Sequence, residues 1–353
     1  MKDRLLQWLV CPDCAGGLTL AVYRRQDNEV NEGTLQCQCG QIFPIIGGVP
    51  RLLCDPLSRN LPRLYPDFFQ RHSDLLENQA KSAAIGVSTG NKATIDRFGY
   101  EWLHFSDYNC DNFDQFVASL PAEFFNGKLG LDVGCGAGRH VRQASRLGAE
   151  VIGIDLSHAV DAAHLNNIDN DRVHIVQADV YNLPFNNGIF QFIYSLGVLH
   201  HLPDPERGYR ALPALLSKGG SLFIWVYAYA LRKVALELLR FISQRLSNHN
   251  VRRMAYLCNL IDYGIFINTY RLLANLPLAG ISIKRHSPLR VKEYANYGFS
   301  VGYTDWFDRL SAPITNYYRE NEMQAWLQHG GLCKTVLRLE GDSWWWLYGE
   351  RKA

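Results

Sequence analysis

The chain has 353 residues, which suggests two domains or one large domain with additions, and 47% of its residues are hydrophobic, which is enough for a packed core. Its formal net charge is only +2, whereas proteins that bind nucleic acid through much of their surface usually carry a stronger basic excess. The start of the chain is charged and no apolar run of about 18 residues occurs, so we expect no secretory signal, no transmembrane helix and a cytoplasmic location.

Residues 1–55 form the first compositional unit, and two close cysteine pairs are its main feature. Cys11 and Cys14 are separated by two residues, whereas Cys37 and Cys39 are separated by one. Four thiolates can bind zinc tetrahedrally and can hold together a domain that is too small for a large core. Four protein ligands leave no open position for water, so the pattern favours a structural zinc ion over a catalytic one. The chain has nine cysteines, an odd number, and those outside the two pairs are scattered along the sequence. This favours reduced thiols over a disulfide framework.

Residues 56–126 are expected to form a linker and amino-terminal helices, because three prolines are followed by a polar stretch and then an aromatic one. In residues 127–353 short apolar runs alternate with helical patterns, which predicts an α/β fold with a parallel, doubly wound sheet. The predicted strands span residues 129–133, 150–154, 173–176, 190–194 and 221–226, and a helix is predicted over 138–147.

Residues 228–318 interrupt this pattern as an insertion with helical spacing over 231–246 and 254–278, followed by a loop rich in aromatic and polar residues. We favour the interpretation that these amphipathic helices pack together and cover a ligand pocket. They could also form a dimer face or lie on a membrane surface. The sequence ends with a predicted helix over 320–329 and a predicted β-hairpin over 333–348. Four rings could form a lid or pack in the core: Tyr100, Trp102, Tyr303 and Trp306.

A glycine-rich turn, Leu131-Asp-Val-Gly-Cys-Gly-Ala-Gly-Arg139, follows the first strand of this sheet and opens a helix. Gly134, Gly136 and Gly138 allow a sharp turn and the close approach of a ligand, because they have no Cβ. The dinucleotide pattern G-x-G-x-x-G would require a third glycine where Arg139 stands, and no G-x-x-x-x-G-K-[ST] loop occurs. The spacing therefore argues against a loop that binds a pyrophosphate.

Two acidic residues follow the next two predicted strands. Asp155 can accept hydrogen bonds from the 2′,3′-diol of a ribose, and a charged acceptor makes such bonds strong. Asp179 can accept a hydrogen bond from an adenine amino group. Ligands of doubly wound sheets bind at the carboxyl ends of the strands, so the pattern predicts a nucleoside ligand there.

With these motifs in place, residues 128–227 resemble the class I S-adenosylmethionine-dependent methyltransferases, and within that class the branch that methylates small molecules and quinone precursors. The resemblance also rests on Leu183-Pro-Phe185, Val198-Leu-His-His-Leu202 and Ser217-Lys-Gly-Gly-Ser-Leu222. It implies a Rossmann-like, seven-stranded sheet with a terminal antiparallel strand, S-adenosylmethionine as the cofactor, and the insertion as a cover for the methyl acceptor. The residues that it places around the cofactor are Asp132, Gly134, Cys135, Gly136, Gly138, Asp155, Leu156, Asp179, Val180 and Ser195.

His200 and His201 follow the fourth predicted strand, beside the expected cofactor edge, and are the candidate catalytic residues. An imidazole with a pKa near 6.5 suits a general base, which the reaction needs only if the acceptor is a hydroxyl or an acidic carbon. The alternative for both residues is packing or shaping of the cofactor pocket. The segment 194–197 lacks the Asn/Asp-Pro-Pro-Tyr signature of many enzymes that methylate nucleobase amines, which argues against such an acceptor.

The amino-terminal unit resembles the small zinc-ribbon activator that partners tRNA, rRNA and protein methyltransferases. The two cysteine pairs and Phe43-Pro-Ile-Ile-Gly-Gly-Val-Pro-Arg51 carry this resemblance. The second pair departs from the pattern, because it is spaced C-x-C and tightens the chelate. A ribbon without metal therefore stays open beside the zinc-bound ribbon.

These observations predict an enzyme that transfers a methyl group from S-adenosylmethionine to a small-molecule acceptor by in-line displacement, with an acceptor atom that the sequence does not define. The alternative is an RNA methyltransferase that contacts rRNA or tRNA through the ribbon. The ribbon favours the RNA substrate, whereas the near-neutral charge and the aromatic insertion favour the small molecule. The complete glycine loop argues against a non-catalytic scaffold, and Arg139 argues against a nicotinamide oxidoreductase. The oligomeric state is left open.

Overall fold

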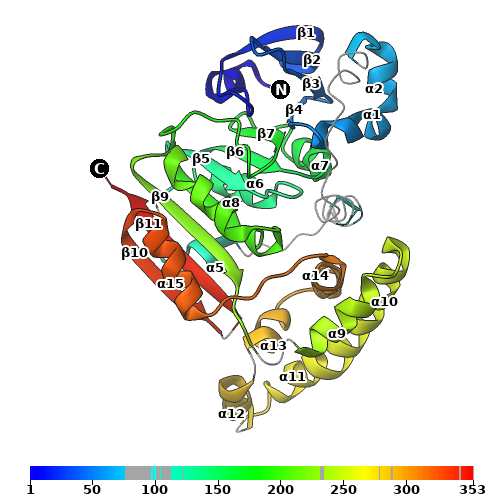
Figure 1. Cartoon of the computed structure of the whole chain (residues 1–353). Coiled ribbons are helices and arrows are strands. Elements are labelled where there is room, and N and C mark those ends of the chain that lie inside the picture. Colours follow the sequence, from blue (N-terminus) through cyan, green and yellow to red (C-terminus); the bar gives the residue numbers. More distant parts are fainter. Residues whose placement is uncertain are drawn as a thin grey trace.

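The computed structural model describes a mixed α/β molecule with an amino-terminal ribbon at one end and a helical insertion at the other (Figure 1). No helix among the described residues combines the length and the apolarity needed to cross a membrane. The described residues are 1–75, 97, 99–100, 104, 113–121, 123–230, 234–277, 279–287, 289–341 and 343–352.

Residues 127–353, which the sequence predicts to be catalytic and which we call the catalytic part, contribute seven of the described strands to the sheet, in the order β7-β6-β5-β8-β9-β11-β10. The first five are parallel, and β11 is antiparallel to both of its neighbours, so the predicted antiparallel strand lies one place inside the edge. Each predicted strand is confirmed, although one of them, β9, begins five residues earlier than expected. The bounds are β5 (Leu129–Val133), β6 (Glu150–Asp155), β7 (Val173–Ala178), β8 (Phe190–Leu196), β9 (Leu216–Tyr227), β10 (Leu332–Glu340) and β11 (Trp344–Arg351).

Helices cover both faces of this sheet, as the doubly wound pattern predicts. On one face, buried residues of α5 (Phe113–Val117), α6 (Arg139–Arg146) and α7 (Ala159–Asn166) share a core with the strands. On the other face, α8 (Pro205–Ala211) and α15 (Glu320–His329) pack on the sheet, as Figure 1 shows. The strands are apolar along nearly their whole length because both of their faces are buried in this way.

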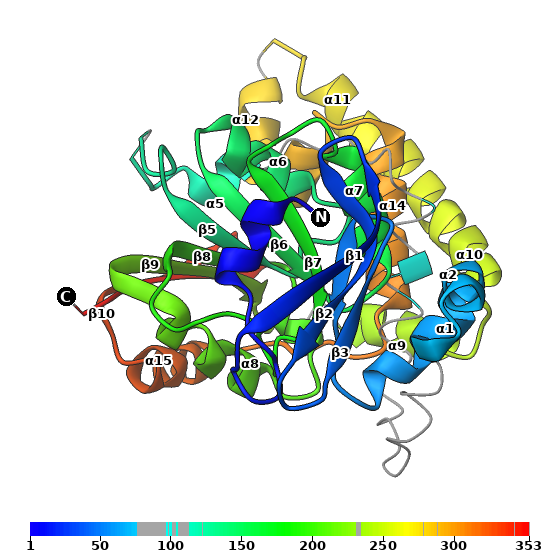
Figure 2. The same ribbon diagram turned by 90° about the horizontal axis from the view of Figure 1, so that it is seen from above.

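The ribbon consists of η1 (Asp3–Trp8) and four antiparallel strands. Its last strand pairs with β7 in parallel, and this pairing joins the ribbon to the catalytic strands in one sheet, which has eleven strands among the described residues. Figure 2 shows the ribbon strands beside β7. The predicted sheet did not include this extension by the ribbon strands. The ribbon strands are β1 (Leu18–Gln26), β2 (Glu29–Cys37), β3 (Ile42–Ile46) and β4 (Val49–Leu52).

A buried arginine fixes the joint between the ribbon and the catalytic part. Arg51 of β4 is fully buried, forms an ion pair with Asp161 of α7, and donates to the Gln177 side chain at 3.1 Å. Its guanidinium carbon also lies 4.6 Å from the ring centre of Tyr65, where a cation–π contact is favourable. These contacts cross from the ribbon to α7 and β7 and so fasten the ribbon to the rest of the sheet.

The linker continues as η2 (Leu57–Asn60), α1 (Leu61–Leu64) and α2 (Pro66–Arg71), and Leu57, Leu61 and Phe68 share a small buried cluster. Most of residues 76–112 lie outside the described residues, and this includes Trp102, one of the four rings expected in a lid or a core.

The insertion is a helical subdomain in which α10 packs against α14. The buried residues Val251 and Ala255 of α10 meet Phe307 and Leu310 of α14, and Tyr100, Tyr303 and Trp306 pack against this cluster. The three described rings thus belong to a core. The loop predicted over the aromatic segment was wrong, because a buried face at helical spacing forms α14 there. The elements are α9 (Val234–Ser243), α10 (Asn248–Ile261), η6 (Asp262–Ile267), α11 (Asn268–Leu273), α12 (Ala279–His286), α13 (Leu289–Tyr294) and α14 (Phe299–Ser311).

Candidate cofactor and zinc sites

The carboxyl ends of neighbouring parallel strands bring the predicted site residues to one edge of the sheet. Asp132 of β5 lies opposite Gly153 of β6 on one side and Tyr194 of β8 on the other. Asp155, the last residue of β6, lies opposite Gln177 of β7. The chain runs outward from β5 to β7 and then returns to β8, so the glycine loop after β5 stands at the reversal of strand order. This is the position where ligands bind in doubly wound sheets.

The backbone of the glycine loop is left-handed at its three glycines, with φ of +85° at Gly134, +51° at Gly136 and +79° at Gly138. A Cβ atom on Gly134 would lie 2.4 Å from a methyl carbon of Val198, which belongs to the loop after β8. Side chains are therefore excluded from this turn both by the backbone conformation and by the lack of space. The loop leads directly into α6, so its backbone lies at a helix amino terminus.

The carboxylate of Asp155 is fixed by hydrogen bonds from nearby residues of the chain. One carboxylate oxygen accepts from the backbone N–H and the hydroxyl of Ser157 at 2.8 and 2.7 Å, and the other accepts from the N–H of Gly136 at 3.0 Å. Burial raises the pKa of the carboxyl, and these hydrogen bonds oppose the rise. A carboxylate offers about four acceptor positions, so three of them are used within the loop and about one remains for a ligand hydroxyl.

Asp132 is almost fully buried, at 1% exposed, and its Oδ2 atom accepts no hydrogen bond from the described residues. The pKa of the Asp132 carboxyl is raised to about 8. Burial is the main cause, the charge of Asp155 adds to the rise, and the nearby Tyr194 hydroxyl opposes it. A buried acceptor without a donor is costly, which marks this carboxyl as a place for a positively charged donor of a ligand. The cationic α-amino group of S-adenosylmethionine has this chemistry, so the residues present fit the expected cofactor.

Asp179 follows β7 and is buried, with one oxygen accepting from the N–H of Tyr181 at 3.0 Å. Burial raises the pKa of this carboxyl as well. The neighbouring Val180 is buried, while Leu156 is partly exposed and packs on the linker cluster. The side chain of Gln177 donates to the Leu156 carbonyl at 2.9 Å and so ties the two strand ends together. An acidic acceptor beside apolar side chains suits a base with an amino group, and the adenine assignment stays a prediction.

Two predicted cofactor residues serve the backbone of the loop. The Ser195 hydroxyl is fully buried and donates to the Val133 carbonyl at 3.0 Å, which fixes β8 to the end of β5. The backbone N–H of Cys135 donates to the Ile154 carbonyl at 2.8 Å, and its thiol is buried close to Gly153. Both residues therefore shape the cradle, and their side chains make these internal contacts.

His200 and His201 lie in η3 (Leu199–His201), directly after the loop that touches Gly134, and both are buried. The Nδ1 atom of His201 lies 2.7 Å from the Ile314 carbonyl, which can only accept, so Nδ1 carries the proton and Nε2 is the basic nitrogen. Burial lowers the pKa of His201 to about 4, so the ring is neutral near pH 7. The ring of His200 packs 4.1 Å from the ring of Tyr227, between centres.

The residues of the insertion that fix these histidines were not predicted from the sequence. The backbone and side-chain nitrogens of Asn316 donate to the His200 carbonyl at 2.8 and 3.1 Å, and Thr315 lies beside Nδ1 of His201. Arg240 of α9 is buried and forms a hydrogen bond with the Thr315 hydroxyl. Tyr227 could have been found, since it ends a strand at the same sheet edge. Thr315 and Asn316 lie more than a hundred residues from the histidines, and Arg240 lies within a helical pattern. No local pattern in the sequence therefore connects these residues with the histidines.

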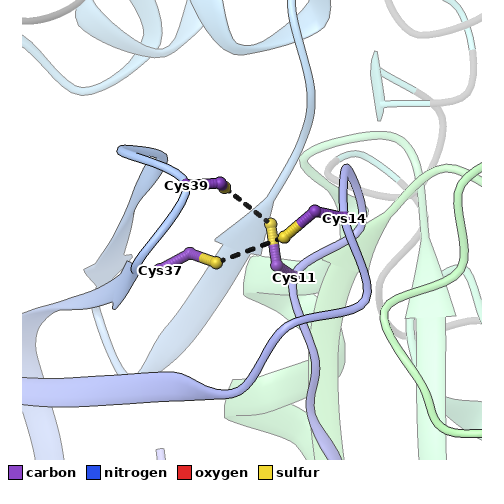
Figure 3. A group of neighbouring side chains, drawn as sticks. All are labelled: Cys11, Cys14, Cys37 and Cys39. Carbon is purple, nitrogen blue, oxygen red and sulfur yellow. Dashed lines mark hydrogen bonds between the residues drawn. The ribbon is translucent and has the colours of Figure 1, made fainter.

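The four predicted cysteine ligands come together between the ribbon knuckles, as Figure 3 shows. The sulfur atoms all lie within 4.8 Å of one another, with 3.7 Å between Cys11 and Cys39 and 3.4 Å between Cys14 and Cys37. Zinc–sulfur bonds of about 2.3 Å in a tetrahedron separate the sulfurs by about 3.8 Å, so the arrangement fits a zinc ion. The C-x-C spacing of the second pair is compatible with this geometry. The eight cysteines in the described part of the chain are free thiols.

The ribbon also supports the loop that follows Asp179. The backbone N–H of Val10, next to the first knuckle, donates to the Pro184 carbonyl at 3.0 Å, and Leu9 pairs with Phe185 as an isolated bridge. Both contacts lie on the segment that leads away from the expected adenine acid. The cysteine cluster and the candidate cofactor site are therefore coupled through a short stretch of backbone.

Comparisons with known proteins identify both parts of the chain. Residues 131–224 match the family model described as a methyltransferase domain, and residues 2–48 match the model described as Trm112p-like protein. The ubiquinone biosynthesis O-methyltransferase of Xanthomonas euvesicatoria is 30% identical over 177 residues, which cover 47% of this chain and 67% of that protein.

Two further relatives match shorter parts. An uncharacterized protein of Synechococcus is 39% identical over 104 residues, but the match spans only a quarter of that protein's length and 28% of this chain. The crystal structure of an S-adenosylmethionine-dependent methyltransferase from Mesorhizobium loti is 28% identical, covers 34% of this chain and 54% of its own, and superposes with a TM-score of 0.31. On the sequence matches, the chain belongs to the S-adenosylmethionine-dependent methyltransferases, a family of enzymes, and carries a Trm112p-like domain at its amino terminus.

Proposed function

We propose that this protein transfers the methyl group of S-adenosylmethionine to a small-molecule acceptor by in-line displacement. The observation that carries the proposal is the glycine cradle, which lies between the buried carboxyl of Asp132, whose Oδ2 accepts no hydrogen bond from the described part of the chain, and the preorganised carboxylate of Asp155. When bound, the cofactor supplies a methyl group on a sulfonium, which is already an activated donor. The chain then has to hold the cofactor, orient the acceptor and exclude water.

Asp132 holds the amino group of the cofactor, Asp155 accepts one ribose hydroxyl, and Asp179 accepts from the adenine amino group. These roles follow the chemistry of each carboxyl and its place at the sheet edge. The direct test is calorimetric titration of the purified full chain with S-adenosylmethionine, using Asp155→Ala as the variant. Saturable one-to-one binding that the substitution abolishes supports the proposal. An absence of binding by folded wild-type protein contradicts it.

His201 acts on the acceptor through Nε2, since Nδ1 is committed to Ile314. Its lowered pKa makes it a weak base, so it suits orientation of an acceptor by a hydrogen bond, or removal of an already acidic proton. We expect His201→Gln to lower kcat by about 10²-fold while cofactor affinity changes little. His200→Gln is the matched control, because His200 packs against Tyr227 and its loss should act mainly through stability. Equal effects of both variants on kcat would contradict the assignment.

The small-molecule acceptor is supported by the distance between the ribbon and the histidines. Four strand spacings separate β4 from β8 in the sheet, which amounts to about 19 Å. The acceptor side is instead closed by the insertion, through Ile314 and Asn316. A screen with labelled S-adenosylmethionine over a metabolite extract and total RNA decides between the acceptors. Label in RNA that is lost when the ribbon surface is mutated would favour the RNA methyltransferase instead.

We further propose that Cys11, Cys14, Cys37 and Cys39 hold a structural zinc ion. The support is the sulfur geometry together with the soft thiolate donor set. We expect metal analysis to find one zinc per chain, and Cys14→Ser to lose it. Cys258→Ser is the control, because Cys258 lies in the insertion, away from the cluster. A protein that purifies folded and free of metal would refute the proposal.

A further inference from the structure

The outer surface of the insertion is apolar where a surface helix is ordinarily polar. We call it the outer stripe, and it consists of Leu257, Leu260, Ile261, Ile265, Leu272 and Leu276 on α10, η6, α11 and the turn that follows. Leu257 is 58% exposed and Leu272 is 71% exposed. Figure 1 shows these elements along the outer edge of the molecule, on the side away from the ribbon.

The spacing of the outer stripe is helical along the continuous run from α10 to α11. Leu260 and Ile261 lie three and four positions after Leu257, Ile265 lies four after Ile261, Leu272 lies seven after Ile265, and Leu276 lies four after Leu272. The opposite face of α10 is already occupied, since Val251, Ala255 and Asn259 are buried against α14. The stripe is therefore a second apolar face in addition to the one that the subdomain needs for its own core. A contiguous apolar face of this kind on a protein surface marks an interaction site.

Neighbouring helices extend the apolar surface. Leu238 and Phe241 of α9 are 66% and 62% exposed, and Ile281 of α12 is 74% exposed. The guanidinium of Arg245 lies 3.7 Å from the ring centre of Phe241, which places a cation at the border of an exposed apolar group. An exposed arginine beside an exposed aromatic ring is a pairing that suits a membrane interface, where the ring can enter the apolar layer and the charge can stay in water.

The charge of the same segment is strongly positive. Residues 228–298 contain eleven lysines and arginines against three acidic residues, a formal charge of +8, although the whole chain carries only +2. Arg253, Lys284 and Arg285 are exposed on the helices that carry or adjoin the outer stripe. The remainder of the chain is accordingly acidic overall. An apolar face bordered by cations is the surface that an anionic lipid bilayer attracts and then accommodates.

We propose that the insertion docks on the surface of an anionic phospholipid bilayer, with the outer stripe in the acyl boundary and the lysines and arginines at the headgroups. A second copy of the chain fits less well, because pairing the stripes would bring two segments of charge +8 together. RNA fits less well because the stripe is aliphatic, whereas RNA-binding surfaces use polar and aromatic side chains. The docking does not depend on the proposed methyl transfer.

The test is flotation of the full-length protein with vesicles of phosphatidylcholine alone or of equimolar phosphatidylcholine and phosphatidylglycerol. We expect binding to the anionic vesicles, weakened by salt. Leu257→Glu combined with Leu260→Glu should lower the partition coefficient by more than about tenfold, because the leucines no longer enter the apolar layer. The matched control is Leu165→Glu with Ile168→Glu, which alters similarly exposed residues near α7 and should leave binding unchanged.

A second variant tests the charges. Lys284→Ala with Arg285→Ala removes two surface cations and should weaken binding to the anionic vesicles by about 30-fold at low salt, at about 1 kcal/mol for each charge. Thermal unfolding and cofactor titration of every variant show whether the fold and the methyltransferase site are intact, so failure of either proposal is separable from failure of the other.

Three outcomes would overturn the docking proposal. The first is the absence of binding to anionic vesicles by folded protein. The second is a dimer in sedimentation equilibrium that the Leu257→Glu and Leu260→Glu pair dissociates, which would assign the stripe to a second copy. The third is salt-sensitive binding of RNA that the Lys284→Ala and Arg285→Ala pair abolishes while vesicles do not bind.

Discussion

Cofactor affinity should rise with pH below neutrality, because binding requires Asp132 to lose a proton. Burial raises the pKa of this carboxyl to about 8, so about nine tenths of the free protein carries it protonated at pH 7. The α-amino group of S-adenosylmethionine is a cation up to about pH 7.7, and a cation beside the carboxyl favours its ionised form. Asp132 therefore ionises on binding and releases its proton to solvent.

The magnitude follows from the pKa. The ionised fraction of Asp132 grows from about 1% at pH 6 to about 9% at pH 7, so the affinity should grow about ninefold and nearly one proton should be released per cofactor. The effect on stability has the opposite sign. The folded free protein keeps a proton that the unfolded chain loses near pH 4, so its unfolding free energy falls as pH rises from about 4 to about 8.

Calorimetric titration across this pH range, in two buffers that differ in ionisation enthalpy, measures both the affinity and the protons released. Asp132→Asn is the matched control, since it keeps the shape of the side chain and cannot ionise. We expect the variant to bind weakly, with no proton release and no gain between the two pH values. If the wild type has the same flat pH profile as the variant, the reasoning about Asp132 is refuted.

Three further perturbations test the fold around the site. Arg51→Met should lower the unfolding free energy by about 2–4 kcal/mol, because it removes the cationic partner of Asp161 and leaves that carboxylate only the Tyr65 hydroxyl. The exposed Arg25→Met should change the unfolding free energy by less than about 1 kcal/mol, and equal losses for the two variants in denaturant unfolding would contradict this. Gly134→Ala should lower the unfolding free energy by about 2–4 kcal/mol and abolish cofactor binding, because the new Cβ strains the left-handed backbone and collides with Val198. A calorimetric isotherm for this variant like that of the wild type would contradict the prediction. Removing zinc with a chelator should lower the melting temperature and the cofactor affinity together, and unchanged affinity would show that the ribbon does not support the cofactor loop.

The local sequence determined the elements that form the cofactor edge. The strands there are mostly apolar, because they are buried on both faces, and such runs are visible in the sequence even though polar residues such as Asp132 and Gln177 interrupt them. The glycine positions were visible because only glycine adopts that turn at so little cost. The cysteine spacing likewise predicted the four-cysteine cluster, since its members come as close pairs.

Only the tertiary structure decided how these parts meet. The parallel pairing of β4 with β7, and the burial of Arg51 at that joint, depend on contacts between residues more than a hundred positions apart. Sequence periodicity also shows that a helix has an apolar face, but not whether that face is covered. The helices of the insertion look alike in the sequence, yet α14 is buried in a core while the outer stripe of α10 and α11 faces outward. That difference depends on which helix lies against which, and no local pattern of residues records it.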